Sequence, residues 1–221
     1  MSFLNHIGVL ILTFNEAPNI GRTLDALWRF SEVIVLDSAS TDGTLDIVAR
    51  HPNARAVVRA FDSHAAQWTH GLTASGLTRP WVLALDADYV VSAALIDEIA
   101  ALRPDDDVSG FRVAFRYCIG GRPLSGSLYL PHVALYRREC AAYIQEGHTQ
   151  RVVVTGLIKE LRGWIDHDDR KPLSRWLASQ QRYAKLEADH LLATPRAKVS
   201  QLGIGDASVD GGREARLCQR E

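Results

Sequence analysis

Acidic and small polar residues follow several apolar runs of the sequence, and residues of these types can hold a metal ion. The sharpest group is Asp86-Ala87-Asp88, which comes directly after the apolar run Trp81–Leu85. Residues i and i+2 of an extended chain point to the same side, so the two carboxylates repel each other unless a cation lies between them. Carboxylate oxygens suit Mg²⁺ or Mn²⁺, and Mg²⁺ usually joins one or two carboxylates to substrate phosphates. The alternative is a pair of turn or capping aspartates before the next helix.

Two earlier polar groups have the same position after an apolar run. Thr13–Glu16 comes at the end of the first run, and Asp37–Gly43 follows the second. Asp37 has two interpretations: it caps the turn before the next helix, or it contacts a ribose hydroxyl or a base edge. The sequence contains neither a GxGxxG nor a Walker A motif, which argues against dinucleotide-binding and P-loop proteins.

Two further polar groups lie in the second half of the chain. Glu146–His148 precedes one apolar run, and Asp166–Lys171 precedes the last helical pattern. His167 is a candidate metal ligand, and its alternative role is that of a surface or capping residue. Arg170 and Lys171 could hold phosphate oxygens, or they could be solvated.

The first half of the sequence alternates strand and helix patterns. Continuous apolar runs predict buried parallel strands, and apolar residues three or four positions apart predict helices. The predicted elements are strand Ile7–Thr13, helix Ile20–Arg29, strand Val33–Leu36, helix Thr44–Arg50, strand Ala56–Arg59, helix Ser63–Ala74, strand Trp81–Leu85 and helix Ala93–Leu102. This order predicts an α/β fold with a mostly parallel sheet and helices on both faces. The carboxyl ends of such strands share one edge, where we expect the acidic groups to converge.

The second half changes character and predicts antiparallel or mixed strands. These strands are Gly110–Cys118, Leu128–Tyr136 and Val152–Ile158. Gly120–Gly121 is a strong turn signal between the first two. The last helix, Arg175–Leu192, is amphipathic and either packs on the sheet or lies on a membrane surface. In the second case Arg175, Arg182 and Lys185 would face lipid headgroups.

The composition is that of an ordinary globular protein. The 221 residues predict one domain over residues 1–198, followed by a flexible or poorly packed tail over residues 199–221. A net charge of −1 argues against a nucleic-acid partner. The three dispersed cysteines include no CxxC pair, which fits a reducing compartment. No apolar run reaches the ~20 residues of a membrane span, and the start lacks the features of a signal peptide. We therefore expect a cytoplasmic protein, with peripheral membrane contact left open.

Three segments taken together resemble the family 2 inverting glycosyltransferases of GT-A fold. They are Thr-Phe-Asn-Glu after the first strand, Val-Ile-Val-Leu-Asp-Ser-Ala-Ser-Thr-Asp-Gly-Thr around the second, and Trp-Val-Leu-Ala-Leu-Asp-Ala-Asp at the fourth. Residues 5–100 carry the resemblance, with a looser match to residue 190. Phe61–Gln67 and Trp164–Tyr183 are similar to the bacterial transferases that build lipopolysaccharide core and other cell-envelope glycans.

The resemblance implies binding of a nucleotide-diphosphate sugar, with UDP favoured, and transfer to a hydroxyl of a glycan or lipid-linked acceptor. It implies a nucleotide-sugar-binding half over residues 1–105 and an acceptor and catalytic half over residues 106–198. The residues implied in donor binding are Thr13, Asn15, Glu16, Asp37, Ser40, Gln67, Asp86 and Ala87. Asp88 and His167 would hold a divalent metal, Mg²⁺ or Mn²⁺, that neutralises the leaving diphosphate.

An inverting transfer also needs a general base that takes the proton of the acceptor hydroxyl. Glu146 lies near the segment where related enzymes carry a His-Glu pair, and Asp166 and Asp168 are its rivals. Two other functions stay open. In a haloacid-dehalogenase-like phosphohydrolase, Asp86 would be the nucleophile and Asp88 the acid–base group. A family member without activity would bind the sugar nucleotide only.

Overall fold

The computed structural model describes residues 2–126, 130–146 and 149–193. In the first half the elements are η1 Phe3–His6, β1 Ile7–Thr13, α1 Ile20–Ala26, β2 Val33–Asp37, α2 Thr44–Val48, β3 Ala54–Val58, α3 His64–Thr73, β4 Trp81–Asp86, β5 Tyr89–Val91 and α4 Ala93–Ala101. In the second half they are β6 Val108–Ile119, β7 Arg122–Pro123, β8 His132–Arg137, η2 Arg138–Cys140, β9 Ala141–Glu146, β10 Thr149–Val154, β11 Leu157–His167 and α5 Leu173–Ala193. The alternating first half matches the predicted order.

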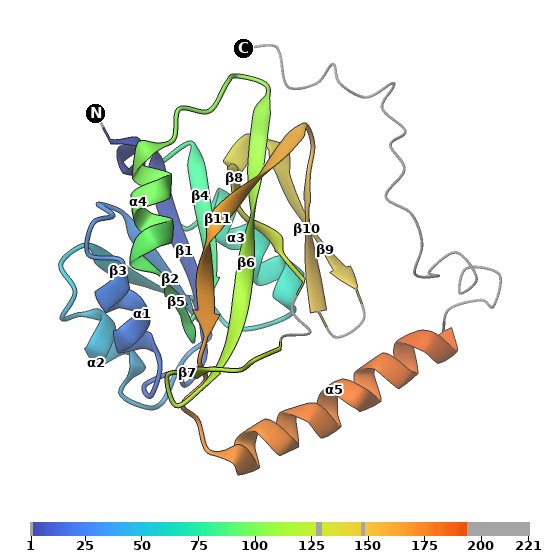
Figure 1. The fold of residues 1–221 in the computed structure, drawn as a ribbon. Helices are drawn as coiled ribbons and strands as arrows, with labels where there is room; N and C mark the ends of the chain where they lie inside the picture. The colour runs from blue at the N-terminus through green and yellow to red at the C-terminus, as the bar shows by residue number, and fades with distance from the viewer. Residues whose placement is uncertain (1, 127–129, 147–148, 194–221) are drawn as a thin grey trace.

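One large mixed sheet includes strands from both halves of the chain (Figure 1). Its order is β3-β2-β1-β4-β8-β6-β11-β5, with β7 paired to β6. Strands β1 to β4 are parallel to one another, β8 is antiparallel to both neighbours, and β6 and β11 are parallel. The mostly parallel α/β architecture is therefore confirmed.

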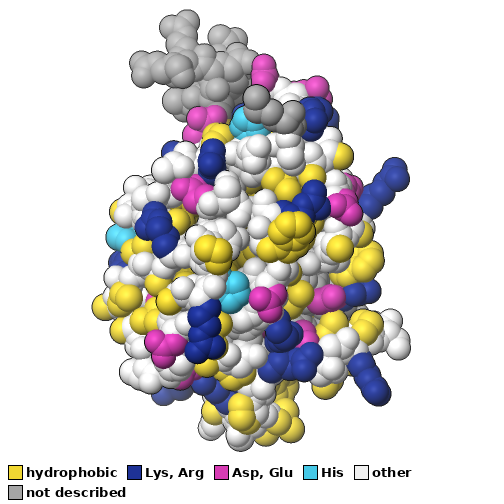
Figure 2. Space-filling view, turned by 90° about the vertical axis from the view of Figure 1, so that its left-hand side faces the viewer, with side chains coloured by type: hydrophobic (Ala, Val, Ile, Leu, Met, Phe, Trp, Pro, Cys, Tyr) yellow, Lys and Arg dark blue, Asp and Glu magenta, His cyan; other side chains and the backbone are white. Residues whose placement is uncertain are grey.

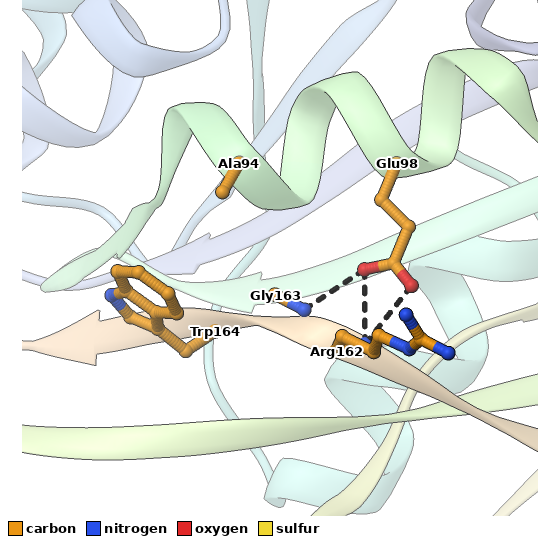
Figure 3. A pocket seen from close by; sticks show the side chains of 5 residues that line it. All are labelled: Ala94, Glu98, Arg162, Gly163 and Trp164. Carbon is orange, nitrogen blue, oxygen red and sulfur yellow. Dashed lines mark hydrogen bonds between the residues drawn. The ribbon is translucent and has the colours of Figure 1, made fainter.

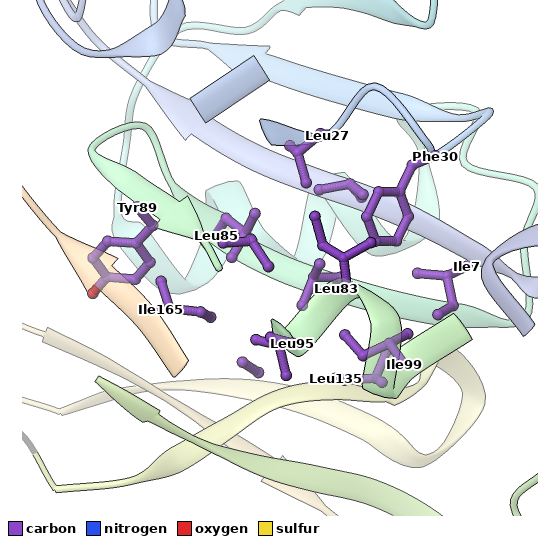
Figure 4. Packing of buried hydrophobic residues seen from close by; sticks show 14 of the residues in the cluster. Ile7, Leu27, Phe30, Leu83, Leu85, Tyr89, Leu95, Ile99, Leu135 and Ile165 are labelled. Carbon is purple, nitrogen blue, oxygen red and sulfur yellow. The ribbon is translucent and has the colours of Figure 1, made fainter. Parts of the chain in front are cut away.

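The parallel strands are continuous apolar runs because both faces of the sheet are covered. Helices α1, α2 and α4 cover one face, where Leu83 and Leu85 pack among residues of the larger hydrophobic cluster (Figure 4). Helix α3 and the β9–β10 hairpin cover the other face, where Leu10 packs against Trp68 and Leu72. The sheet is therefore the middle layer at β1, β2 and β4, whereas β11 alternates buried and exposed residues.

Local signals explain where two of the helices begin. Ser63 caps α3 by accepting a hydrogen bond from the Ala66 amide, and Ser92 caps α4 in the same way through the Leu95 amide. Gly120 and Gly121 both have positive φ and form the two-residue turn that pairs Ile119 with Arg122. The predicted glycine turn is confirmed, although it joins β6 to the short strand β7.

The structure corrects three predictions about the second half. The predicted strand Val152–Ile158 is wrong, because the chain turns at Gly156 (φ 114°) between β10 and β11. The predicted strand Leu128–Tyr136 begins at His132 as β8, and residues 127–129 lie outside the described part. Packing of the last helix on the sheet is also wrong, because none of the described side chains of α5 is buried.

The surface carries both signs of charge. Figure 2 shows acidic and basic side chains interspersed over the face that holds α1, α2 and α4. This pattern agrees with the net charge of −1. No helix in the described ranges is both long enough and apolar enough to span a bilayer. Residues 199–221, the predicted tail, lie outside the described ranges.

Candidate active site

The loops after β1 and β2 are held together by Asp37. Its carboxylate is fully buried and accepts hydrogen bonds from the Thr13 hydroxyl (2.8 Å) and from the Ser40 amide and hydroxyl (2.7 and 2.6 Å). Adjacent strands bring these residues together, because Thr13 pairs with Asp37 in the β1–β2 register. Asp37 thus caps the turn after β2, as one of its two interpretations predicts.

Asn15, Glu16 and Gln67 extend this arrangement. Asn15 has a left-handed backbone (φ 55°), and its amide donates to the Ser40 hydroxyl at 2.8 Å. The Glu16 amide donates to Thr44 Oγ1 at 2.8 Å. Gln67 projects from α3, where its amide nitrogen donates to Ser38 Oγ at 2.9 Å. The two loops and the first turns of α3 therefore form one hydrogen-bonded wall at the carboxyl edge of the sheet.

The acidic pair lies on the next strand, beside this wall. Asp86 is the last residue of β4, whereas Ala87 and Asp88 form a turn into β5. The expectation that both aspartates share one extended segment is therefore wrong. Ala87 is buried, and its carbonyl accepts a hydrogen bond from the Thr23 hydroxyl at 2.7 Å, which fixes the turn. The two carboxylates still interact, because the Asp88 charge helps to raise the pKa of Asp86.

His167 ends β11 and contacts Asp88 across the sheet edge. The His167 Nε2 atom lies 3.1 Å from Asp88 Oδ2, and the Asp168 amide donates to the Asp88 carbonyl at 3.1 Å. The rings of Tyr89 and Tyr117 lie 5.1 and 4.5 Å from the imidazole, centroid to centroid. The two predicted metal ligands are thus neighbours, although they are 79 residues apart in sequence.

Burial and charge shift the pKa values in opposite directions within this group. Burial, with the Asp88 charge, raises the pKa of Asp86 to about 6. Burial also acts to raise the pKa of Asp88, but the hydrogen bond and charge of His167 outweigh it, and the pKa falls. The pKa of His167 is raised, because the contact with Asp88 outweighs the effect of burial. Asp88 is therefore a stable anion next to a carboxyl group that resists ionisation.

The segment Asp168–Pro172, here called the linker, joins β11 to α5 and closes one side of the site. Lys171 Nζ forms an ion pair with the Glu16 carboxylate, and the two side chains are only 15% and 14% exposed. Asn19 bridges the same segments, accepting from the Arg170 amide and donating to Asp169 Oδ1, each at 2.8 Å. Sequence reasoning missed Asn19, because nothing local marks a partner about 150 residues away.

Asp168 and Asp166 both form ion pairs with arginine side chains. Asp168 Oδ2 accepts from Arg22 (2.9 Å) and Arg170 (2.8 Å), while its Oδ1 accepts from the Gly121 amide at 3.1 Å. Burial acts to raise the pKa of Asp168, but these hydrogen bonds outweigh it and lower the pKa. Asp166 forms a two-point ion pair with Arg116, at 2.7 and 3.0 Å. Both carboxylates therefore stabilise the linker and its neighbours.

The third base candidate, Glu146, ends β9, and its side chain lies outside the described residues. Gly147 and His148 lie outside them as well. The neighbouring residue Gln145 accepts a hydrogen bond from the Ala65 amide at 3.3 Å, in the first turn of α3. The end of β9 is therefore next to the helix that supplies Gln67.

A metal ion at this edge would need ligands in addition to the described side chains. Within the described residues, no group of three or more His, Cys, Asp or Glu side chains is arranged to hold a metal. Asp88 and His167 supply an oxygen and a nitrogen donor at the site edge. This donor set fits Mn²⁺ or Mg²⁺ if substrate phosphates complete the coordination.

A shallow depression of about 620 Å³ lies apart from this edge, between α4 and β11 (Figure 3). Glu98 points into it and accepts hydrogen bonds from the Arg162 and Gly163 amides, at 3.0 and 2.8 Å. These amides lie where the β6–β11 register shifts, so Glu98 satisfies a β-bulge. The contact between Glu98 and this bulge therefore accounts for the residues that line the depression.

Comparison with known proteins agrees with this arrangement. The family model described as "Glycosyl transferase family 2" matches residues 8–151. The chain is 27% identical over 192 residues to the lipopolysaccharide core biosynthesis glycosyltransferase LpsC of Rhizobium meliloti (strain 1021). That match covers 83% of this chain and 70% of LpsC.

Two solved structures share the fold. Glucosyl-3-phosphoglycerate synthase from Mycobacterium tuberculosis, solved with Mn²⁺, UDP and glucosyl-3-phosphoglycerate, is similar with a TM-score of 0.53 at 16% identity. The match covers 87% of this chain and 82% of the synthase. Residues 1–349 of S. aureus TarS, solved with UDP-GlcNAc, give a TM-score of 0.50 at 16% identity, with 90% and 76% covered. The fold is therefore that of GT-A glycosyltransferases.

Proposed function

The chain belongs to glycosyl transferase family 2, and from this premise we propose that it moves a sugar from a nucleotide-diphosphate sugar to a hydroxyl group by an inverting displacement. One observation carries the proposal: the Asp88–His167 pair lies at the same sheet edge as the polar wall around Asp37. Membership of this family sets aside the phosphohydrolase alternative, in which Asp86 would be a nucleophile.

The wall is suited to the nucleoside. Thr13, Asn15, Glu16, Asp37, Ser40 and Gln67 form this part of the proposed donor site, and Asp86 and Ala87 continue it toward the diphosphate. UDP is the favoured nucleotide, because both similar structures were solved with UDP or a UDP-sugar. The hydrogen bonds that Asp37 accepts from Ser40 would also hold the loop after β2 in shape before the donor binds.

The charge of the site supports a divalent cation. The Asp88 charge acts to raise the pKa values of both Glu16 and Asp86, the Glu16 charge acts to raise that of Asp86, and the neighbouring cationic groups are Lys171 and His167. A diphosphate would meet repulsion from these carboxylates unless further positive charge were present. Asp88 and His167 would hold Mg²⁺ or Mn²⁺ together with diphosphate oxygens. The bound metal would stabilise the negative charge that develops on the leaving diphosphate.

We assign the general base to Glu146. In the displacement, the acceptor oxygen forms a bond to the anomeric carbon, the bond from that carbon to the diphosphate breaks, and the acceptor proton passes to the carboxylate. Asp166 and Asp168 are weaker candidates, because their oxygens already accept hydrogen bonds from arginine side chains. The position of β9 beside α3 supports Glu146.

The acceptor class follows from the relatives. LpsC is named for lipopolysaccharide core biosynthesis, so a glycan or lipid-linked acceptor of the cell envelope is the proposed substrate. Transfer to a lipid-linked acceptor would take place at the inner face of the cytoplasmic membrane, with the protein in peripheral contact.

Thermal-shift measurements test the donor and the metal together. UDP-, GDP-, ADP- and CMP-sugars are added to the protein with and without Mn²⁺. A donor at about 100 times its Kd stabilises the fold by about 2.7 kcal/mol, or roughly 5–10 °C for a chain of this size. We expect this shift with a UDP-sugar plus Mn²⁺, and its loss in Asp88→Ala.

Asp97→Ala is the matched control, because Asp97 is an exposed aspartate of α4 paired with Arg29. It should keep the full shift. If no sugar nucleotide stabilises the protein with any metal, the proposal fails. Donor binding without turnover on a broad acceptor panel would instead identify a member of the family that has lost activity.

A further inference from the structure

Helix α5 extends away from the body of the protein (Figure 1). Large apolar side chains are exposed along its whole length. They are Leu173, Trp176, Leu177, Leu186, Leu191 and Leu192. A monomeric soluble protein rarely leaves so many large apolar side chains of one element in water, so such a surface indicates a partner.

The apolar residues of α5 are concentrated on one face. At 100° per residue, Leu173, Leu177, Ala184 and Leu191 fall within about 40° of one another. We call this face the α5 stripe, and Trp176 lies at its edge. The opposite side carries basic residues together with Leu186. The helix is therefore amphipathic although it covers no part of the sheet.

Arg175 and Arg182 lie opposite the α5 stripe, and Lys185 lies between them and Leu192. All three basic side chains are exposed. A helix with Leu and Trp on one face and Lys and Arg on the other has the pattern of helices that lie in a membrane interface.

The β6–β7 turn adds apolar surface beside the start of α5. Ile119 is 70% exposed on this turn, and Leu173 is 69% exposed at the first residue of the helix. The Gly121 amide donates to Asp168 at 3.1 Å, so the turn contacts the linker that leads into α5. Leu124 is also exposed there, 49%. The apolar surface therefore continues from the helix to the edge of the sheet that holds the site.

We propose that the α5 stripe, with Ile119 and Leu124, docks the protein on a membrane that contains anionic lipids. The charge complementarity comes from exposed basic residues: Arg122 on the β6–β7 turn, Lys185 at the flank of α5, and Arg175 and Arg182 on the side opposite the stripe. The inference rests on the proposed function, in which the acceptor is a glycan or lipid-linked substrate of the cell envelope.

The sequence of the stripe favours a membrane over a second copy of the chain. Gln180 and Glu187 lie between Trp176 and Leu191 on the helical wheel. A helix–helix interface would bury these polar groups, at a cost in free energy. At a membrane surface they remain at headgroup depth, in contact with water, which limits the helix to shallow insertion.

Cosedimentation with vesicles tests the proposal on the full chain. Vesicles of phosphatidylcholine alone are compared with vesicles that also contain phosphatidylglycerol. We expect binding to the anionic vesicles, weakened by salt because the headgroup attraction is screened. The variant Leu173→Ser/Leu177→Ser should bind at least about tenfold more weakly, since each lost leucine removes apolar burial.

The matched control is Leu186→Ser/Leu192→Ser, which removes two exposed leucines of the same helix outside the stripe. It should bind as the unchanged protein does. Absence of vesicle binding, or equal loss in both double variants, would overturn the proposal. A dimer that dissociates in Leu173→Ser/Leu177→Ser, without vesicle binding, would assign the face to a second copy.

The thermal shift with a UDP-sugar and Mn²⁺ is measured on the same preparations. A normal donor shift with no vesicle binding overturns the membrane surface and leaves the proposed function intact. Vesicle binding without any donor shift supports the membrane surface and overturns the proposed function.

Discussion

Asp86 is the site residue whose ionisation most reduces the stability of the folded protein. Its carboxyl group is at the end of β4, enclosed by neighbours, and close to the charge of Asp88. Burial removes hydration from this carboxylate, and the Tyr89 hydrogen bond and the His167 charge offset only part of the cost. Such a cost is typical of binding sites, where a ligand or metal later supplies the missing charge.

Replacing Asp86 by asparagine should therefore stabilise the protein at neutral pH. The pKa of Asp86 is about 6 in the folded state against 3.8 for an ordinary aspartate. A raised folded pKa favours folding below pH 3.8, and this contribution is lost as pH rises through 6. At 1.36 kcal/mol per pKa unit, the penalty at pH 7 is up to about 3 kcal/mol.

Denaturant unfolding without metal, at pH 5 and pH 8, checks this. The stability difference between Asp86→Asn and the unchanged protein should be larger at pH 8. A difference that does not depend on pH would contradict the raised pKa. The variant should also lose the thermal shift with a UDP-sugar, because a stabilising change at a binding site costs function.

The sequence suggested which single residues belong to the site better than it suggested their partners. Asp88 and His167 were both predicted as metal ligands on the basis of the resemblance, but their contact with each other was not predicted. Their contact depends on β11 pairing with both β5 and β6, and no local pattern encodes that pairing. The ion pairs of Asp166 and Asp168 were missed for the same reason.

At the scale of elements, the linker and the β1–α1 loop behave as one unit. Lys171 and Glu16 form its central ion pair, and both side chains are mostly buried. Burial acts to raise the pKa of Glu16 and outweighs the opposing effect of Lys171, so the carboxylate depends on this lysine. The site is therefore closed by a contact between segments that are 155 residues apart.

Lys171→Met should destabilise the protein by about 2–4 kcal/mol, because it leaves the Glu16 carboxylate mostly buried with the Asn19 amide as a donor but without its cationic partner. Adding Glu16→Gln should recover most of the loss, with a coupling free energy above about 1 kcal/mol. Denaturant unfolding of the four proteins of this double-mutant cycle measures the coupling. Purely additive effects would mean that the pair does not hold the linker in place.

Helix α4 and strand β11 approach so closely that only glycine fits at position 163. A Cβ atom on Gly163 would lie 2.5 Å from the Leu95 Cα atom and 2.6 Å from its Cβ atom. We expect Gly163→Ala to cost about 1–3 kcal/mol through overpacking. Thermal unfolding should show no effect for the control Gly126→Ala, since nothing lies within 4 Å of that position. Equal melting temperatures for both variants would disprove the close packing.

A strand that is buried on both faces could be located from the sequence more accurately than β11, which is covered on one face. β1 was predicted with its observed bounds because Ile7–Thr13 is apolar throughout. β11 alternates buried and exposed residues and includes a bulge, so it lacks the continuous apolar run that predicts a buried strand. Gly156 was the sequence signal for the turn before β11. With φ at 114° and a Cβ atom that would lie 2.2 Å from Ser109 Oγ, this position requires glycine.

At the scale of the whole molecule, one sheet joins the donor and acceptor halves that the resemblance implied. β8 and β6 lie between β4 and β11, so strands of the second half bring His167 to the edge formed by the first. The net charge of −1 is an average over this edge, where carboxylates gather, and a helix whose exposed polar face is basic. The two surfaces are suited to different partners, a metal–diphosphate and an anionic lipid.

A chain that ends at Pro172 tests whether α5 belongs to the folded body or only to its surface. No described side chain of α5 is buried, so removing this helix takes away little apolar burial. The melting temperature should change by less than about 2 °C, which corresponds to less than about 1 kcal/mol. The UDP-sugar shift should remain, because Asp88, His167 and Lys171 all precede the cut. Vesicle binding should be lost, because the α5 stripe is gone. A fall of more than about 5 °C would show that α5 packs against the body, and its apolar face would then have a structural role.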